Sequence, residues 1–142
     1  MKKIILTSIL LSSTTLMGLC ATADYYDKYG QKAGYYTQNG STVDKYDKYG
    51  QKTGFYTTSS NGIVSEYDKY GQKEGSYVKN GSSVTAYDKY GQKTGSYVTD
   101  SSGTTTKYDK YGQKTGSFKT DALGKVVEYD KYGNKVGSYN KN

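Results

Sequence analysis

The fold of this chain is set by one short stretch, Tyr26-Asp27-Lys28-Tyr29-Gly30-Gln31-Lys32, which is followed by Gly34 and Tyr36. The same pattern starts again, at intervals of 20 or 21 residues, at Tyr46, Tyr67, Tyr87, Tyr108 and Tyr129. A constant period of this length is typical of repeat arrays, in which each unit packs only against its neighbours. No linker or change of composition interrupts the pattern, so we interpret residues 24–142 as a single array of six repeats.

The repeat is predicted to be a β-hairpin. Glycine recurs every few residues and no run places apolar residues three and four apart, which disfavours helix. Turn signals recur about every ten residues, which indicates two strands per repeat. We therefore predict an all-β fold of tandem antiparallel β-hairpin repeats, with six units of 20–21 residues in a twisted meander of about twelve strands. An open sheet, a solenoid and a partial shell remain alternatives at this point.

Two kinds of turn alternate along the chain. In Asp47-Lys48-Tyr49-Gly50, Asp can accept backbone hydrogen bonds and Gly tolerates the left-handed conformation. If this turn is a four-residue loop, Tyr46 and Tyr56 lie on opposite faces. If it is a three-residue bulged turn, the faces exchange at every repeat. The glycine before the second aromatic residue, such as Gly95 before Tyr97, is expected to leave space for a neighbouring ring.

The second kind of turn comes in two lengths. Asn39-Gly40 and Asn80-Gly81 are predicted as two-residue type I′ loops, which would place Tyr36 opposite Val43. The longer version is predicted as a type I turn closed by a left-handed glycine, at Ser59-Ser60-Asn61-Gly62, Asp100-Ser101-Ser102-Gly103 and Asp121-Ala122-Leu123-Gly124. It would place Tyr97 opposite Lys107. In both registers the second aromatic residue shares a face with the residues one and three before the next Tyr-Asp.

Residues 1–23 are predicted to be a signal peptide. A positive start at Lys2-Lys3 is followed by a mostly apolar run, and Ala21-Thr22-Ala23 fits the small-x-small cleavage pattern. We therefore expect export to the periplasm, the cell surface or the medium, with no membrane span after cleavage. An uncleaved anchor and a lipid on Cys20 are alternatives, although Leu19 stands where a lipoprotein signal has a small residue.

Composition excludes most catalytic chemistry. The chain has no His, and residues 24–142 have no Cys, so neither an imidazole base nor a thiolate nucleophile is present. Only one carboxylate recurs in each repeat, where it can cap its own turn, whereas a calcium site needs several oxygen ligands. We predict no enzyme activity, no cofactor and no metal. The absence of Arg and the alternation of Lys with Asp also argue against nucleic-acid binding.

Tyrosine replaces the usual aliphatic residues. Residues 24–142 contain only 12 Ile, Leu, Val and Phe, which by itself would favour disorder, but all 19 Tyr of the chain lie there. We interpret the chain as folded by aromatic packing. A second interpretation treats some rings as exposed platforms on which sugars stack beside glutamine amides. The candidate binding residues are Tyr36, Tyr56, Tyr77 and Tyr97 with Gln51, Gln72 and Gln92.

The repeat resembles known hairpin arrays. Tyr108-Asp109-Lys110-Tyr111-Gly112-Gln113 is similar to the YD repeats of Rhs and teneurin-type shell proteins, although those shells carry many more units and often Arg where Gln113 stands. The Gly-Gln-Lys-Thr-Gly-Ser-Tyr segment resembles bacterial MORN-variant repeats. A looser likeness is to the aromatic repeats of choline- and glucan-binding proteins, whose Trp is missing. All three resemblances imply β-hairpin arrays, and only the last implies a ligand.

These observations predict a secreted or envelope-associated protein that acts by interaction. The expected partner is an envelope polysaccharide or peptidoglycan, bound through repeated tyrosine platforms, because identical weak sites gain avidity on a polymer. The alternative is a purely structural or fibre-forming protein that associates with itself, which the Lys and Asp of every repeat would oppose.

Overall fold

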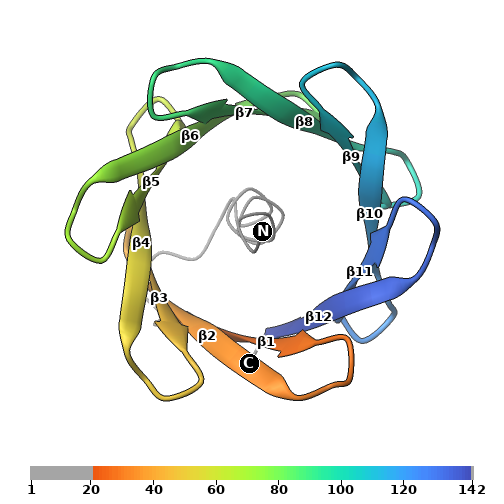
Figure 1. Ribbon diagram of the computed structural model, residues 1–142, viewed down its shortest axis with the longest axis horizontal. Coiled ribbons are helices and arrows are strands. Elements are labelled where there is room, and N and C mark those ends of the chain that lie inside the picture. The colour runs from red at the N-terminus through yellow and green to blue at the C-terminus, as the bar shows by residue number, and fades with distance from the viewer. Residues whose placement is uncertain (1–20, 142) are drawn as a thin grey trace.

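A computed structural model describes residues 21–141 as a closed barrel of antiparallel strands. Figure 1 looks along the barrel and shows the strands as a ring. The strands are β1 (Ala21–Asp27), β2 (Lys32–Asn39), β3 (Thr42–Asp47), β4 (Lys52–Thr58), β5 (Val64–Asp68), β6 (Lys73–Asn80), β7 (Ser83–Asp88), β8 (Lys93–Thr99), β9 (Thr105–Asp109), β10 (Lys114–Thr120), β11 (Val126–Asp130) and β12 (Lys135–Lys141). The predicted all-β hairpin meander is confirmed.

Closure of the barrel is the main departure from expectation. Each strand pairs with its neighbours in sequence, and β1 pairs with β12, with Tyr25 opposite Tyr139 and Asp24 opposite Asn140. The open sheet, the solenoid and the partial shell are therefore wrong. The twist between successive hairpins carries the sheet round until its first and last strands meet.

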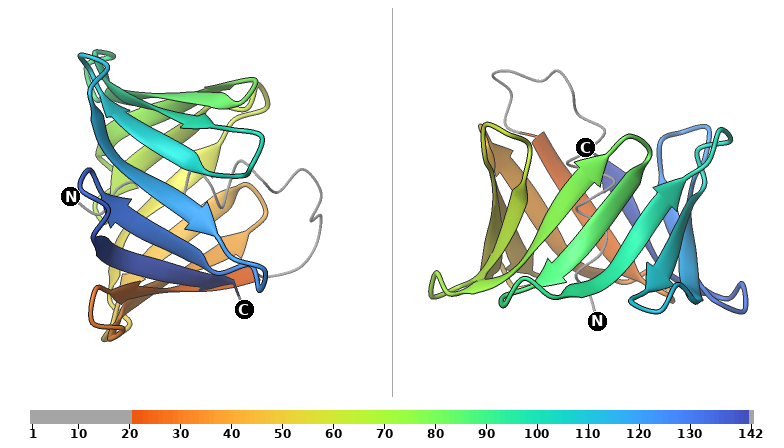
Figure 2. Two further views of the ribbon diagram at one scale, coloured as in Figure 1. Left: turned by 90° about the vertical axis from the view of Figure 1, so that its right-hand side faces the viewer. Right: turned by 90° about the horizontal axis from the view of Figure 1, so that it is seen from above.

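The Tyr-Asp turns all lie at one end of the barrel because they join odd to even strands, and the other turns lie at the opposite end (Figure 2). In the first turn the Asp27 N–H donates to the Gln31 carbonyl at 2.9 Å, and Gly30 has a φ of 81°. Of the two alternatives left open by the sequence, this geometry is the three-residue bulged turn.

A second bulge follows every Tyr-Asp turn. It cancels the effect of the first bulge, so that equivalent side chains point to the same side of the sheet in every repeat. Tyr26 pairs with Lys32 while Tyr25 pairs with Gly34, so that Ala33 is an extra residue, and the same register shift recurs in all six repeats. The exchange of faces that a three-residue turn alone would have caused therefore does not occur. The Tyr of each Tyr-Asp points outward and the second aromatic residue points inward, as the four-residue alternative had required.

The opposite turns are partly as predicted. In the longer version, the Asp100 N–H donates to the Thr104 carbonyl at 2.9 Å and Gly103 has a φ of 82°, which confirms the type I turn with a left-handed glycine. The register of Tyr97 opposite Lys107 is also confirmed.

The predicted Asn-Gly loops are wrong by one residue. Asn39 pairs with Thr42, so the loop is Gly40–Ser41, and only Gly40 has a positive φ, which is a type II′ turn. Tyr36 consequently pairs with Lys45 instead of Val43. Because this shift equals two residues, Tyr36 still shares a face with Val43.

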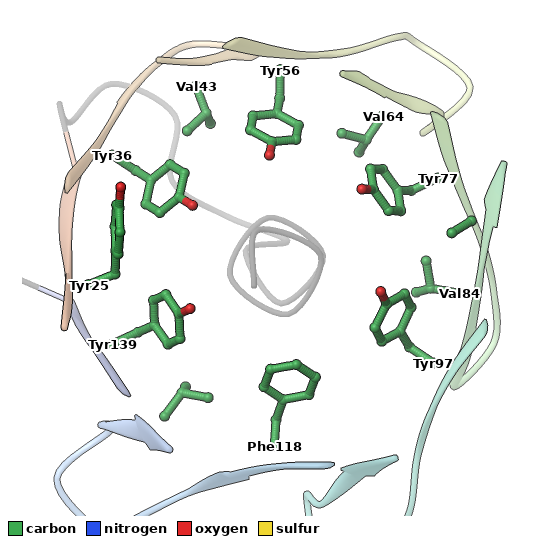
Figure 3. Packing of buried hydrophobic residues seen from close by; sticks show 12 residues of the cluster. Tyr25, Tyr36, Val43, Tyr56, Val64, Tyr77, Val84, Tyr97, Phe118 and Tyr139 are labelled. Carbon is green, nitrogen blue, oxygen red and sulfur yellow. The ribbon is translucent and has the colours of Figure 1, made fainter. Parts of the chain in front are cut away.

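The interior of the barrel is lined mainly by aromatic and β-branched side chains (Figure 3). The buried cluster comprises Tyr25, Tyr36, Val43, Tyr56, Val64, Tyr77, Val84, Ala86, Tyr97, Phe118, Val126 and Tyr139. Aromatic packing in place of an aliphatic core is therefore confirmed.

The amino-terminal prediction lies mostly outside the described residues. Of the predicted signal peptide, residues 1–20 with Cys20 are outside that range, and Ala21–Ala23 form the start of β1. Ala23 is buried and pairs with Tyr36. Within residues 21–141, no helix is long and apolar enough to cross a membrane.

A glycine before each inward aromatic residue allows two strands to approach closely. A Cβ on Gly75 would lie 2.6 Å from the Tyr87 carbonyl oxygen, and one on Gly95 would lie 2.5 Å from that of Tyr108. The predicted neighbouring ring is found at Gly34, where the Tyr25 phenol occupies the space. At Gly95 the neighbour is backbone instead, so that prediction was wrong there.

Substitution of Gly75 tests this close approach. We expect Gly75→Ala to lower the free energy of unfolding by about 1–3 kcal/mol, because two strands must separate to admit the methyl group. Urea unfolding followed by circular dichroism measures the change. Gly137→Ala is the matched control, since its Cβ would lie 3.0 Å from the nearest atom, and should cost less. A Gly75→Ala protein as stable as the wild type would contradict the account.

Candidate functional site

The first candidate surface is a ring of aromatic side chains inside the barrel. Every repeat contributes one inward ring, at Tyr36, Tyr56, Tyr77, Tyr97, Phe118 and Tyr139. Figure 3 shows the hydroxyl groups of the five tyrosines directed toward the centre of the barrel. Tyr25 adds a seventh ring and packs against Tyr36, with centroids 5.3 Å apart. The lumen wall is therefore both aromatic and rich in phenolic hydroxyl groups.

The predicted binding residues fall into two separate places. Tyr36, Tyr56, Tyr77 and Tyr97 belong to the inward ring and are only 1–7% exposed, so they do not form a platform on the outer surface. Gln51, Gln72 and Gln92 lie exposed beside the Tyr-Asp turns at the barrel end. Gln51 lies five residues before Tyr56, or about 16 Å along a strand. The predicted pairing of rings with glutamine amides is thus not assembled, and a binding role for either group stays a prediction.

Glu66 is a buried acid within the aromatic ring. It is 4% exposed, and its carboxylate accepts hydrogen bonds from the hydroxyl groups of Tyr56 at 3.2 Å and Tyr77 at 3.0 Å. Burial, reinforced by the charge of Glu66, raises the pKa of both phenols far above the usual value. Two neutral tyrosine donors therefore offset much of the cost of burying this carboxylate.

The second candidate surface is a crown of tyrosines at the Tyr-Asp end of the barrel. These residues, here called the tyrosine rim, are all 76–78% exposed and comprise Tyr29, Tyr49, Tyr70, Tyr90, Tyr111 and Tyr132. The ammonium group of the preceding lysine lies over each ring, 4.8–5.0 Å from its centroid. The rim thus presents six copies of an exposed phenol with an adjacent cation.

The tips of the rim are held by the turn aspartates. At Asp47, one carboxylate oxygen accepts hydrogen bonds from the backbone N–H groups of Tyr49 and Gln51, both at 2.9 Å. The other five turns repeat this arrangement through Asp27, Asp68, Asp88, Asp109 and Asp130. The predicted capping role of these acids is confirmed, and each tip is a turn closed by the same hydrogen bonds.

The tyrosine rim was missed by the sequence reasoning, although its signal was present. The third residue of the predicted four-residue turn Asp47-Lys48-Tyr49-Gly50 must lie at the hairpin tip, where no neighbouring strand can cover it. The prediction instead placed the platform on the second aromatic residue of the repeat. That residue belongs to a strand and, in a closed barrel, is buried.

The outer wall carries two smaller aromatic pairs. Tyr35 stacks on Tyr46 with centroids 4.8 Å apart, and Phe55 stacks on Tyr67 at 4.9 Å. Lys52 lies over the Phe55 ring. The equivalents of Tyr35 in the remaining four repeats are serines, so these stacks are confined to the first two repeats.

Among residues 21–141, no group of three or more His, Cys, Asp or Glu side chains is arranged to hold a metal ion. No protein-family model matches the chain, and a search of curated proteins finds no significant match. The resemblance to YD and MORN-variant repeats therefore stays a prediction.

Alkaline titration tests the buried tyrosines. Burial raises the pKa of six of them above the unfolded value of about 10: Tyr25, Tyr36, Tyr56, Tyr77, Tyr97 and Tyr139. Their contribution to stability is complete below pH 10 and is lost as the pH rises beyond it, because the unfolded chain then releases protons that the folded protein retains. We expect the absorbance change of six tyrosinates to appear only as the β-sheet signal disappears.

The control for this titration is the double variant Tyr36→Phe/Tyr97→Phe. It should reduce from six to four the tyrosines that ionise only on unfolding, and leave the earlier ionisation unchanged. Ionisation of all 19 tyrosines while the circular dichroism spectrum stays unchanged would contradict the buried ring.

Proposed function

We propose that this protein is an exported, non-catalytic binding protein that holds a surface polymer, of the glycan class, through the tyrosine rim. The observation that carries the proposal is the repetition of one exposed tip, Lys-Tyr, six times around a single end of the barrel. Large aromatic residues exposed together at equivalent positions are typical of interaction sites.

The chemistry of each tip suits a sugar. A tyrosine ring offers a flat apolar face for the C–H face of a pyranose, and its hydroxyl group can hydrogen-bond sugar hydroxyls. The neighbouring lysine adds a donor for hydroxyl or carboxylate groups. The Asp-capped turn fixes the backbone before binding, which lowers the entropy lost when a ligand is held.

The ring-like arrangement favours a polymer over a small molecule. One exposed phenol beside one lysine makes a weak site, but six equivalent sites on one rigid body raise the effective concentration of neighbouring chain segments. An envelope polysaccharide or peptidoglycan strand carries the repeating units that such a rim would use.

The alternative, a structural or fibre-forming protein, is less favoured by the closed barrel. A fibre grows by pairing strand edges between molecules, and in residues 21–141 every strand is paired on both sides. Export rests on the predicted signal peptide, most of which lies outside the described residues.

Binding experiments with rim variants test the proposal. We expect the purified protein to bind soluble peptidoglycan fragments or envelope polysaccharide saturably in isothermal titration calorimetry. Tyr49→Ser, Tyr70→Ser and Tyr90→Ser, combined, should weaken binding by at least about tenfold, because half of the linked sites are removed.

Two control proteins keep this test specific. Ser60→Ala, Ser101→Ala and Leu123→Ala, combined, alter the opposite end of the barrel and should leave the affinity unchanged. Tyr36→Phe and Tyr97→Phe alter two predicted binding residues inside the barrel and should also leave it unchanged. Equal losses in the rim and opposite-end proteins, or no binding by the wild type, would refute the proposal.

A further inference from the structure

The lumen contains one position that varies among the repeats. The residue just before each Tyr-Asp faces inward, and along the chain these residues are Tyr25, Lys45, Glu66, Ala86, Lys107 and Glu128. The pattern Lys, Glu, uncharged occurs twice, with a period of three repeats. Since six repeats close the barrel, positions three repeats apart lie on opposite walls.

The lumen therefore has two Lys–Glu pairs facing each other across the barrel. In the first pair, Lys45 on β3 and Glu66 on β5 are separated by β4. In the second pair, Lys107 on β9 and Glu128 on β11 are separated by β10. The two pairs have equivalent backbone positions, so each serves as a reference for the other.

The two glutamates differ in their hydrogen-bond donors. Glu66 pairs with Tyr56 across the sheet and receives its hydroxyl group in addition to that of Tyr77. The residue that pairs with Glu128 is Phe118, which has no hydroxyl group. Only the Tyr139 hydroxyl remains as the equivalent of Tyr77. Within residues 21–141, the hydroxyl donor that Glu66 receives from Tyr56 thus has no equivalent at Glu128, which leaves one acceptor site open there.

Burial affects both members of the second pair. It raises the pKa of the Glu128 carboxyl, against the opposing influence of Lys107 and the Tyr139 hydroxyl. It lowers the pKa of the Lys107 ammonium, against the opposing influence of Glu128. Each charge is therefore incompletely compensated, and each would be stabilised by an opposite charge brought by a ligand.

A cavity of about 390 Å³ opens beside this second pair. It lies at the Tyr-Asp end of the lumen, and its lining includes Lys107, Glu128, Phe118, Tyr139 and Tyr25. Its volume falls within the range of small-molecule sites, about 300–1,000 Å³. It combines an anion, a cation and three aromatic rings in one partly open cavity.

We propose that this cavity binds a small zwitterion of the amino-acid type, with its ammonium group at Glu128, its carboxylate at Lys107 and an apolar side chain against Phe118 and Tyr139. The open acceptor site of Glu128 receives the ammonium donor that Phe118 cannot supply. The aromatic rings exclude water from the side chain, which strengthens both ionic contacts. This site is distinct from the tyrosine rim and does not depend on polymer binding.

The test is a titration followed by NMR, with glycine, leucine and phenylalanine as probes up to millimolar concentrations. We expect saturable shifts, with leucine and phenylalanine binding more tightly than glycine. Phenylacetate and phenethylamine each carry one of the two charges and should bind at least tenfold more weakly than phenylalanine. Equal binding of either compound, or no binding of any amino acid, would overturn the proposal.

Variants on the two walls locate the site. Glu128→Gln and Lys107→Met should each weaken phenylalanine binding at least tenfold. The equivalent changes on the opposite wall, Glu66→Gln and Lys45→Met, should leave the affinity within about twofold. Similar losses from both walls would overturn the assignment.

A third variant tests the role of the missing hydroxyl group. Phe118→Tyr restores at Glu128 the donor that Tyr56 provides at Glu66, and should weaken binding with little change in stability. Unfolding curves of all variants separate loss of binding from loss of fold. Unchanged affinity in Phe118→Tyr would show that the open acceptor is not used.

Discussion

The pairing of β1 with β12 is the contact on which the rest of the structure depends. It gives the sheet an inside and an outside, so that tyrosines which would lie on one face of an open sheet become a buried ring. It also leaves no unpaired edge within residues 21–141. Because all Tyr-Asp turns join odd to even strands, closure gathers their six tips around one end and creates the tyrosine rim.

Repetition and variation have different roles in this barrel. The constant features build the frame: a capped turn, a second bulge, a glycine at the close approach and an inward aromatic ring. The position before Tyr-Asp varies and sets the pattern of charge on the lumen wall. Single substitutions within this frame, such as Phe118 where Tyr56 stands in another repeat, create local differences that a fully symmetric barrel would lack.

Much of the hairpin architecture could be predicted from the sequence, because it depends on local chemistry. Asp47 and Gly50 define their turn, and the period of the repeat fixes the number of strands. Closure could not be predicted, since it depends on the sum of small rotations over the whole sheet. The bulge at Ala33 and the type II′ turn at Gly40 could not be predicted either, because several turn geometries suit the same residues. Pairing with the neighbouring strand determines which geometry forms.

The measurement that tests closure most directly is a cross-link between the first and last strands. Asp24 and Asn140 are paired on the outer wall, so Asp24→Cys and Asn140→Cys, in a Cys20→Ser background, should form an intramolecular disulfide in the folded monomer. The account predicts near-complete cross-linking under mild oxidation that urea abolishes. A folded monomer in which these cysteines remain free, or link only between molecules, would contradict a closed barrel.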